Sequence, residues 1–120
     1  KLADQSSIRQ DVAKSFCEVE MARLLTLKAA DRMDKVGNKD AKDLIAAIKV
    51  VAPRMAQEVC DRAIQSHGGM GVSDDTPIAS FFTINRFVRI ADGPDEVHMS
   101  QLGKQKIREY TTMNERGGTR

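Results

Sequence analysis

The sequence contains few aromatic residues, few cysteines and no long apolar run. Aromatic side chains make up 4% of its 120 residues, with one Tyr and no Trp, which disfavours single-strand nucleic-acid binding because that function needs stacking platforms. The two cysteines, Cys17 and Cys60, cannot form a disulfide framework and are predicted to be small buried hydrophobic residues of a reduced, intracellular protein. No stretch approaches the roughly 20 uncharged apolar residues of a membrane helix, so no membrane span is predicted.

Charges nearly balance, and possible metal ligands are scarce. The chain has 19 Lys and Arg against 17 Asp and Glu, a net charge of +2, and so small an excess does not predict nucleic-acid binding. His67 and His98 share no recurring spacing with the cysteines, so no metal site is predicted. A length of 120 residues with 41% hydrophobic residues predicts one domain with a real core.

What the sequence does have is helical periodicity. Apolar residues recur at steps of three or four in four stretches, without the alternation that is typical of β-strands. We therefore predict an all-α fold, a four-helix up-and-down bundle over residues 1–113, followed by a frayed tail over 114–120. The expected helices cover residues 4–33, 40–66, 77–90 and 94–110.

The second expected helix has apolar residues on two faces and should lie at the centre of the bundle. Pro53 inside it removes one backbone donor and should kink the helix near Lys49 without breaking it. Gly37 is expected to end the first helix in the left-handed conformation, and Asn38 or Asp40 to cap the second helix. The fourth stretch has a thin apolar stripe, which predicts an exposed or subunit-facing helix.

Four of the eight glycines lie in two loops between helices: Gly68, Gly69, Gly71 and Gly93. Glycine loops between antiparallel helices are commonly turns and nothing more. Three closely spaced glycines also let a backbone approach a ligand, with the amides of the following helix facing an anion such as a diphosphate. The first loop lacks the lysine of a P-loop and follows a helix instead of a strand, so it is not a dinucleotide fingerprint. The pattern alone leaves both interpretations open.

Asp92 in the second loop is a candidate general base. It stands between Ile90-Ala91 and Gly93, and partial desolvation by apolar neighbours would suit that role. The alternative is a solvated or helix-capping aspartate, and the pattern leaves this interpretation open as well. The polar side chains of the following turn are expected to face water: Asp95, Glu96 and His98.

Two segments of the chain resemble one known family. Residues 63–72 read Ala-Ile-Gln-Ser-His-Gly-Gly-Met-Gly-Val, and residues 89–98 read Arg-Ile-Ala-Asp-Gly-Pro-Asp-Glu-Val-His. Both motifs, at this mutual distance, resemble the carboxy-terminal domain of the acyl-CoA dehydrogenases, and the resemblance covers all but the last few residues. The second motif is most similar to the large multidomain branch whose members also carry kinase-like domains.

The resemblance implies a flavin-dependent dehydrogenation that belongs to fatty-acid β-oxidation. In the family, a base removes the α-proton of an acyl-CoA thioester while the β-hydrogen leaves as hydride to FAD, which gives a trans-2-enoyl-CoA. The resemblance further implies an acyl-CoA substrate, a homo-oligomer (dimer or tetramer) and electron-transfer flavoprotein as electron acceptor. It also implies an intracellular protein, mitochondrial or peroxisomal in a eukaryote and cytoplasmic in a bacterium.

The same resemblance assigns roles to individual residues. Asp92 lies where many relatives have a glutamate that acts as the catalytic base, and aspartate retracts the carboxylate by one methylene. Gln65, Gly68 and Gly69 match the loop that approaches the diphosphate of a flavin held by a neighbouring subunit. Glu96 lies where relatives have a glutamine that touches the flavin on its own side.

The resemblance also implies that parts of the family's fold are missing. The chain is expected to begin inside the family's first carboxy-terminal helix and to lack the amino-terminal helical domain and the middle β-domain, which carry most of the flavin and acyl pocket. The 120 residues alone are therefore expected to be inactive. The alternative is a non-catalytic helical oligomerisation or interaction bundle derived from the family. A third interpretation is nucleic-acid binding by the basic fourth helix, as in the alkylation-response relatives.

Overall fold

A computed structural model describes residues 1–117 of the chain. These residues form four α-helices and two short 3₁₀ turns: η1 (Leu2–Asp4), α1 (Ser6–Asp40), α2 (Lys42–His67), η2 (Gly68–Val72), α3 (Ile78–Val88) and α4 (Asp95–Gly117). No strand occurs among the described residues. The predicted all-α fold with four helices is therefore confirmed.

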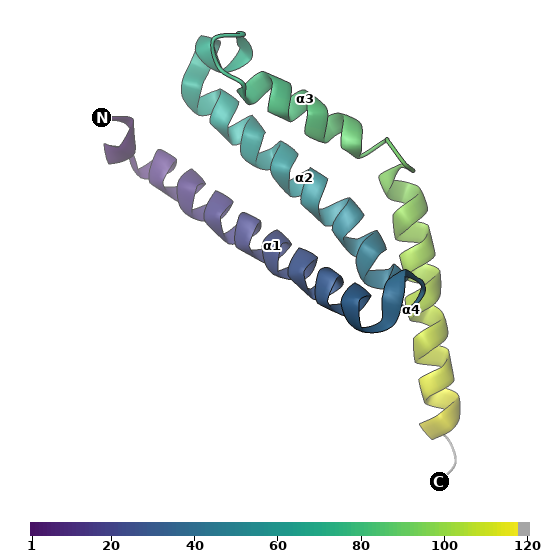
Figure 1. Cartoon of the computed structure of the whole chain (residues 1–120). Helices are drawn as coiled ribbons and strands as arrows, with labels where there is room; N and C mark the ends of the chain where they lie inside the picture. Colours follow the sequence, from purple (N-terminus) through teal and green to yellow (C-terminus); the bar gives the residue numbers. More distant parts are fainter. Residues whose placement is uncertain (118–120) are drawn as a thin grey trace.

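α2 is the central element of the fold. α1 packs antiparallel to it, α3 folds back along its C-terminal half, and α4 lies across its N-terminal turns and extends beyond the other helices (Figure 1). Within residues 1–117, α1, α3 and α4 make no close backbone contacts with one another. The expected central position of the second helix is thus confirmed, and the bundle is open, with three helices arranged around one.

The core of this open bundle is built from small residues. The buried apolar residues are Ala22, Ala29, Ala41, Ala46 and Val50. Because alanine has no side chain beyond Cβ, α1 and α2 can approach each other closely along this line. Larger apolar side chains face outward, and Phe16, Phe87 and Ile107 are 63 to 69% exposed. The four helices therefore leave substantial apolar faces uncovered.

The junction of α1 and α2 differs from the expectation in detail. Gly37 has a positive φ of 77°, but its ψ of 171° lies outside the left-handed conformation that was expected, and helical structure resumes after it and ends at Asp40. Gly37 is therefore a kink within α1 and not its end. The N-cap of α2 is Ala41, which has no side-chain oxygen, so the expected side-chain cap is wrong. α2 itself runs unbroken through the buried Pro53.

α4 is longer than the sequence predicted. It continues past Tyr110 to Gly117, so residues 114–117 of the expected tail are helical, and residues 118–120 lie outside the described residues. The apolar side chains of this extension, Tyr110 and Met113, are exposed. Their exposure agrees with the thin apolar stripe of the sequence.

Residues 1–117 hold no disulfide, metal cluster or membrane-crossing helix. Cys17 and Cys60 are both free, and Cys17 is exposed because no other helix covers its position on α1, so its expected burial is wrong. Cys60 is half-buried, and this burial raises the pKa of its thiol. None of the described helices combines the length and apolarity needed to cross a membrane, and no three metal-ligating side chains gather among these residues.

Candidate functional site

The glycine loop after α2 is fixed by its own backbone. A Cβ atom added at Gly71 would lie 2.5 Å from the carbonyl oxygen and 2.8 Å from the Cα of Ile64, so only glycine fits there. Gly68 has a positive φ of 59°, a conformation that glycine adopts without strain. The Ser73 hydroxyl donates to the Met70 carbonyl at 2.9 Å and closes the loop. The fold itself thus requires two of the three glycines.

Gly69 is the glycine that the fold does not require. A Cβ atom there would have no neighbour within 4 Å, and its φ does not lie in the positive range. Gly69 and Gly68 are both exposed, as is Gln65 one turn earlier on α2. A bare, exposed backbone of this kind allows a group from outside the chain to approach closely.

Asp92 and Gly93 form the turn between α3 and α4. Asp92 has a φ of 54°, and it is the only residue besides glycine with positive φ among the described residues; Gly93 has a φ of 100°. Nε2 of His98 lies 3.2 Å from the carbonyl oxygen of Asp92. The Asp92 side chain is exposed, so the expected desolvation by Ile90 does not occur within residues 1–117. The left-handed backbone at a non-glycine residue indicates strain that the surroundings must hold in place.

An ion-pair network holds the end of this loop. Asp95 is only 4% exposed, and its Oδ2 accepts a hydrogen bond from Arg89 Nε at 2.8 Å. Arg89 also donates from Nη1 to Oε1 of Gln57 at 2.9 Å, and Arg54 Nη2 lies 3.7 Å from Asp95 Oδ2. The expectation that Asp95 faces water is therefore wrong: two arginines approach Oδ2 of its carboxylate and compensate the buried charge, while Oδ1 is buried without a hydrogen-bond partner among residues 1–117. Glu96, in contrast, is exposed as expected.

A groove of about 400 Å³ lies beside Asp92. Its residues come from α1, from α2, from the loop and from α4, and the surface that they present to the groove is almost entirely apolar: Thr26, Ile45, Ile48, Lys49, Ala52, Pro53, Asp92 and His98. An aspartate beside an apolar groove can take a proton from a carbon acid that the groove holds once its carboxylate turns toward that acid. This arrangement makes the groove the best candidate for a reaction site on this chain.

The structure gathers the predicted site residues into two groups. Gln65, Gly68 and Gly69 lie at the end of α2, whereas Asp92 and Glu96 lie around the turn into α4. α3 separates the groups, and its 11 residues correspond to a length of about 16 Å. One copy of this chain therefore does not bring the two groups to the same place.

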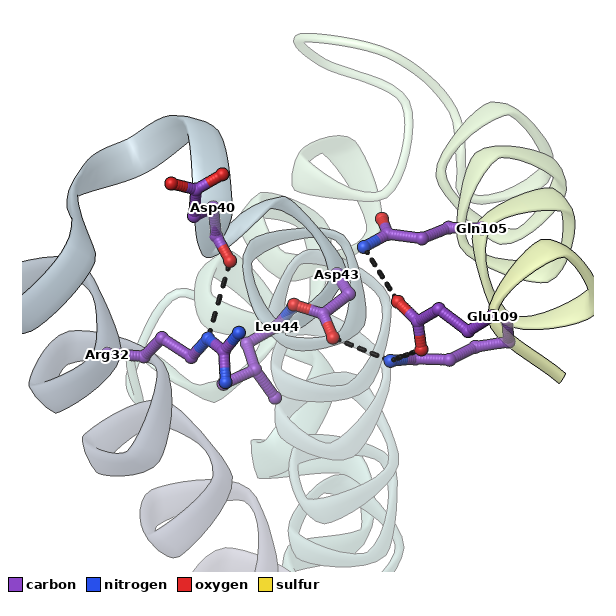
Figure 2. Close-up of polar contacts among 7 residues, drawn as sticks. Arg32, Asp40, Asp43, Leu44, Gln105 and Glu109 are labelled. Carbon is purple, nitrogen blue, oxygen red and sulfur yellow. Dashed lines mark hydrogen bonds and ion pairs between the residues drawn. The ribbon is translucent and has the colours of Figure 1, made fainter. Parts of the chain in front are cut away.

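A second polar cluster ties α4 to the start of α2 (Figure 2). Lys106 Nζ donates to Oδ2 of Asp43 at 2.7 Å and to Oε2 of Glu109 at 2.9 Å. The hydrogen bond from Lys106 holds the pKa of Asp43 below its usual range, and the pKa of Lys106 is raised in turn. This cluster fixes the direction of α4, the helix that begins directly after the Asp92 turn.

Sequence reasoning missed the side chains that support the loop. Lys49, Arg54 and Gln57 lie on α2, at least 32 residues from the loop residues that they contact, and periodicity alone treats them as ordinary helix positions. One signal was present: Arg89 and Asp95 carry opposite charges on the two sides of a glycine-proline turn. Such a pair can indicate an ion pair that joins the two ends of a loop.

Comparison with known proteins identifies the family. Residues 1–107 match the family described as "Acyl-CoA dehydrogenase, C-terminal domain". The chain is 51% identical to "Probable acyl-CoA dehydrogenase FadE2" of Mycobacterium tuberculosis, with 92% of this chain and 28% of that protein covered. It is 50% identical to "Acyl-CoA dehydrogenase family member 10" of Mus musculus, with 95% of this chain and 11% of that protein covered. A solved structure from Mycobacterium abscessus, assigned to the acyl-CoA dehydrogenases, matches with a TM-score of 0.87 and 41% identity over 90% of this chain and 26% of that chain.

The fold and its two glycine loops are thus those of the helical C-terminal domain of a dehydrogenase. The chain belongs to the acyl-CoA dehydrogenase family. It spans between about a tenth and somewhat over a quarter of the length of the relatives named above, 11 to 28%. Most of the length of those proteins therefore has no counterpart in this chain.

Proposed function

We propose that this chain is the C-terminal domain of a flavin-dependent acyl-CoA dehydrogenase that converts an acyl-CoA thioester to a trans-2-enoyl-CoA. The observation that carries the proposal is the position of Asp92, which lies at an apolar groove on a loop fixed by an ion-pair network. In this role Asp92 accepts the α-proton of the substrate. Because aspartate is one methylene shorter than glutamate, about 1 Å, the loop backbone must lie correspondingly nearer to the substrate.

The exposed glycine loop fits a bound FAD. Gly69 has open space where a side chain would lie, and this bare backbone, together with Gln65 and Gly68, suits the approach of a diphosphate. Glu96, exposed in the first turn of α4, is proposed to contact the flavin on the Asp92 side. FAD supplies the hydride acceptor when it is bound. Since the two groups lie at opposite ends of α3, we propose that one domain contributes to two flavins.

A domain that serves two flavins requires a homo-oligomer, a dimer or a tetramer. The exposed apolar side chains of α3 and α4 support this part of the proposal: Phe81, Ile84, Phe87, Ile107 and Tyr110. Large exposed apolar faces are typical of protein interfaces. The proposal also includes an acyl-CoA substrate, electron-transfer flavoprotein as electron acceptor, a place in fatty-acid β-oxidation and an intracellular location.

The substitution Asp92→Asn in the full-length protein that carries this domain tests the proposal. Asparagine keeps the size of the side chain but removes the proton acceptor, so flavin reduction by acyl-CoA should slow roughly 100- to 10,000-fold. Rapid mixing under anaerobic conditions follows the bleaching of the flavin and isolates this step. The acyl-CoA concentration that gives half the limiting rate should stay the same.

Asp61→Asn is the matched control, because Asp61 is an exposed aspartate of α2 that lies outside the groove. In this variant the flavin should bleach at the same rate as in the unsubstituted protein. Asp92→Glu introduces the glutamate that many relatives have at this position. Its rate of flavin reduction tests whether the loop backbone lies nearer to the substrate than a glutamate would need. Unchanged bleaching in Asp92→Asn would place the base elsewhere. A full-length protein that binds no flavin would favour the alternative of a non-catalytic helical bundle.

A further inference from the structure

Lys49 joins the two ends of the loop that carries Asp92. Its Nζ donates to the carbonyl oxygen of Val88 at 2.6 Å and lies within hydrogen-bond distance of the carbonyl oxygen of Gly93 at 3.4 Å. Val88 is the last residue of α3, and Gly93 directly follows Asp92. One ammonium group from the N-terminal third of α2 therefore contacts the chain both before and after the candidate base.

The chemistry of these contacts explains why a lysine serves here. The last carbonyls of a helix have no intrahelical donor and carry partial negative charge, which an ammonium group satisfies. Lys49 is half-buried and lines the apolar groove. Burial of a cation costs free energy unless it is hydrogen-bonded, and both carbonyls face it from the loop.

The residue between these contacts is strained. Asp92 has a φ of 54°, and His98 Nε2 lies against its carbonyl oxygen at 3.2 Å, while Lys49 holds the next carbonyl, that of Gly93. A left-handed conformation at a residue with a side chain persists only where its surroundings fix it. Without the ammonium group the Gly93 carbonyl is released, and the Asp92 peptide can relax toward an ordinary conformation.

We propose that Lys49 is a positioning residue for Asp92: by bridging Val88 and Gly93 it fixes the loop so that Asp92 is held beside the groove. This proposal rests on the proposed function of Asp92. Arg89 and Asp95 hold the far end of the loop to α4 and α2, but Lys49 both contacts the loop and lines the groove. Its removal should therefore affect the geometry of proton removal more than the fold.

A double-mutant cycle in the full-length flavoprotein tests the proposal. Lys49→Met, which keeps the length of the side chain and removes its charge and donors, is made alone and together with Asp92→Asn. Butyryl-, octanoyl- and palmitoyl-CoA are screened, and anaerobic flavin reduction is followed with the one that reacts fastest. Flavin content and thermal midpoint are measured for each variant, and Lys42→Met, an exposed lysine of the same helix, is the control.

We expect Lys49→Met to slow flavin reduction roughly 10- to 100-fold in the unsubstituted protein, the cost of a misplacement of about 1 Å. In the Asp92→Asn background the same change should slow it by less than about threefold, because no base remains to be positioned. Lys42→Met should have no effect in either background. The half-saturating acyl-CoA concentration should stay constant throughout.

Equal slowing in both backgrounds would overturn the inference, because Lys49 would then act independently of Asp92. So would an unchanged rate in Lys49→Met. Failure of the proposed function gives a different result: Asp92→Asn alone would then reduce its flavin at the normal rate. If Lys49→Met does not fold with flavin, Lys49→Arg carries the same cycle, since its longer donor group shifts the Gly93 carbonyl while the cation is retained.

Discussion

The two glycine loops of this domain are held in place in different ways. In the loop after α2, Gly71 lies directly against the backbone of Ile64 and the Ser73 hydroxyl turns back to a neighbouring carbonyl, so all contacts are local. The loop between α3 and α4 is fixed by charged side chains: the Arg89–Asp95 ion pair across the loop itself, and Lys49 and Arg54 from distant positions on α2. The conformation of the first loop therefore depends on the absence of side-chain volume at Gly71, and that of the second loop depends on charged contacts.

This difference predicts opposite sensitivities to substitution. A loop held by backbone contact should tolerate the loss of a charge and not the addition of a methyl group. A loop held by ion pairs should respond strongly to the loss of one charge, because the partner charge is then left uncompensated.

The largest effect is expected where the charge network is broken. Asp95→Asn keeps the volume of the side chain but leaves Arg89, 23% exposed, without its buried partner. The free energy of unfolding should fall by about 3 kcal/mol, as measured by urea denaturation of the chain. Glu96→Gln is the control, since the adjacent Glu96 is exposed, and it should change the value by less than about 0.5 kcal/mol. Similar losses in both variants would contradict a charge-dependent loop.

A somewhat smaller loss is expected from added volume in the other loop. Gly71→Ala would place a methyl group 2.5 Å from the Ile64 carbonyl oxygen, and because both are backbone-anchored, the loop must move away from α2. Unfolding free energy should fall by about 2 kcal/mol. Asp75→Asn removes a charge from the same loop and should be neutral within about 0.5 kcal/mol. If Asp75→Asn proved the more damaging change, the volume argument would fail.

The Asp43–Lys106 ion pair between α2 and α4 should make a contribution that depends on pH. The pKa of Asp43 is lowered in the folded chain by the hydrogen bond from Lys106, so its contribution is complete above the unfolded pKa of about 3.9. It is lost as the pH falls through the lower, folded pKa. At pH 7, Asp43→Asn should cost about 1 kcal/mol.

Unfolding in urea at neutral pH and near pH 3 measures this difference. The gap between the unsubstituted chain and Asp43→Asn should shrink at the lower pH. Asp40→Asn is the control, because in Figure 2 only the backbone carbonyl of Asp40 makes a marked contact, as acceptor from Arg32 Nε. A gap of the same size at both pH values would mean that the ion pair does not contribute.

The features that sequence analysis predicted are local ones. Apolar steps of three and four residues defined four helices, and Gly37 was recognised as a point of interruption because a glycine followed by polar residues is typical there, although its ψ of 171° is not left-handed. Sequence analysis failed where a feature does not follow from neighbouring residues. Nothing near Tyr110 in the sequence indicates that α4 continues to Gly117. The spacing of apolar residues is compatible both with a helix that ends at Tyr110 and with one that continues.

The candidate site follows the same rule. Asp92 and the loop glycines were found because glycine and proline punctuate the sequence there, and the family resemblance gave them roles. Lys49 was noticed only as the expected position of a kink, although its contacts reach residues 39 and 44 positions away. Burial of Asp95 was missed for the same reason, since the arginine that compensates it from α2 belongs to another helix.

The smallest effect on stability is expected at Gly69. A substitution there should also separate the stability of the fold from the binding of FAD most clearly. A methyl group there meets no atom within 4 Å, and its φ lies outside the strained range, so Gly69→Ala should leave the unfolding free energy unchanged or raise it by up to about 0.5 kcal/mol. If a flavin diphosphate approaches this backbone in the full-length protein, the same methyl group should weaken FAD binding about tenfold, or about 1.4 kcal/mol. Gly103→Ala on α4, also open within 4 Å, is the matched control and should leave FAD affinity unchanged. Equal FAD affinity in both variants, measured by calorimetry on the apoprotein, would remove the glycine loop from the flavin site and leave it as a turn alone.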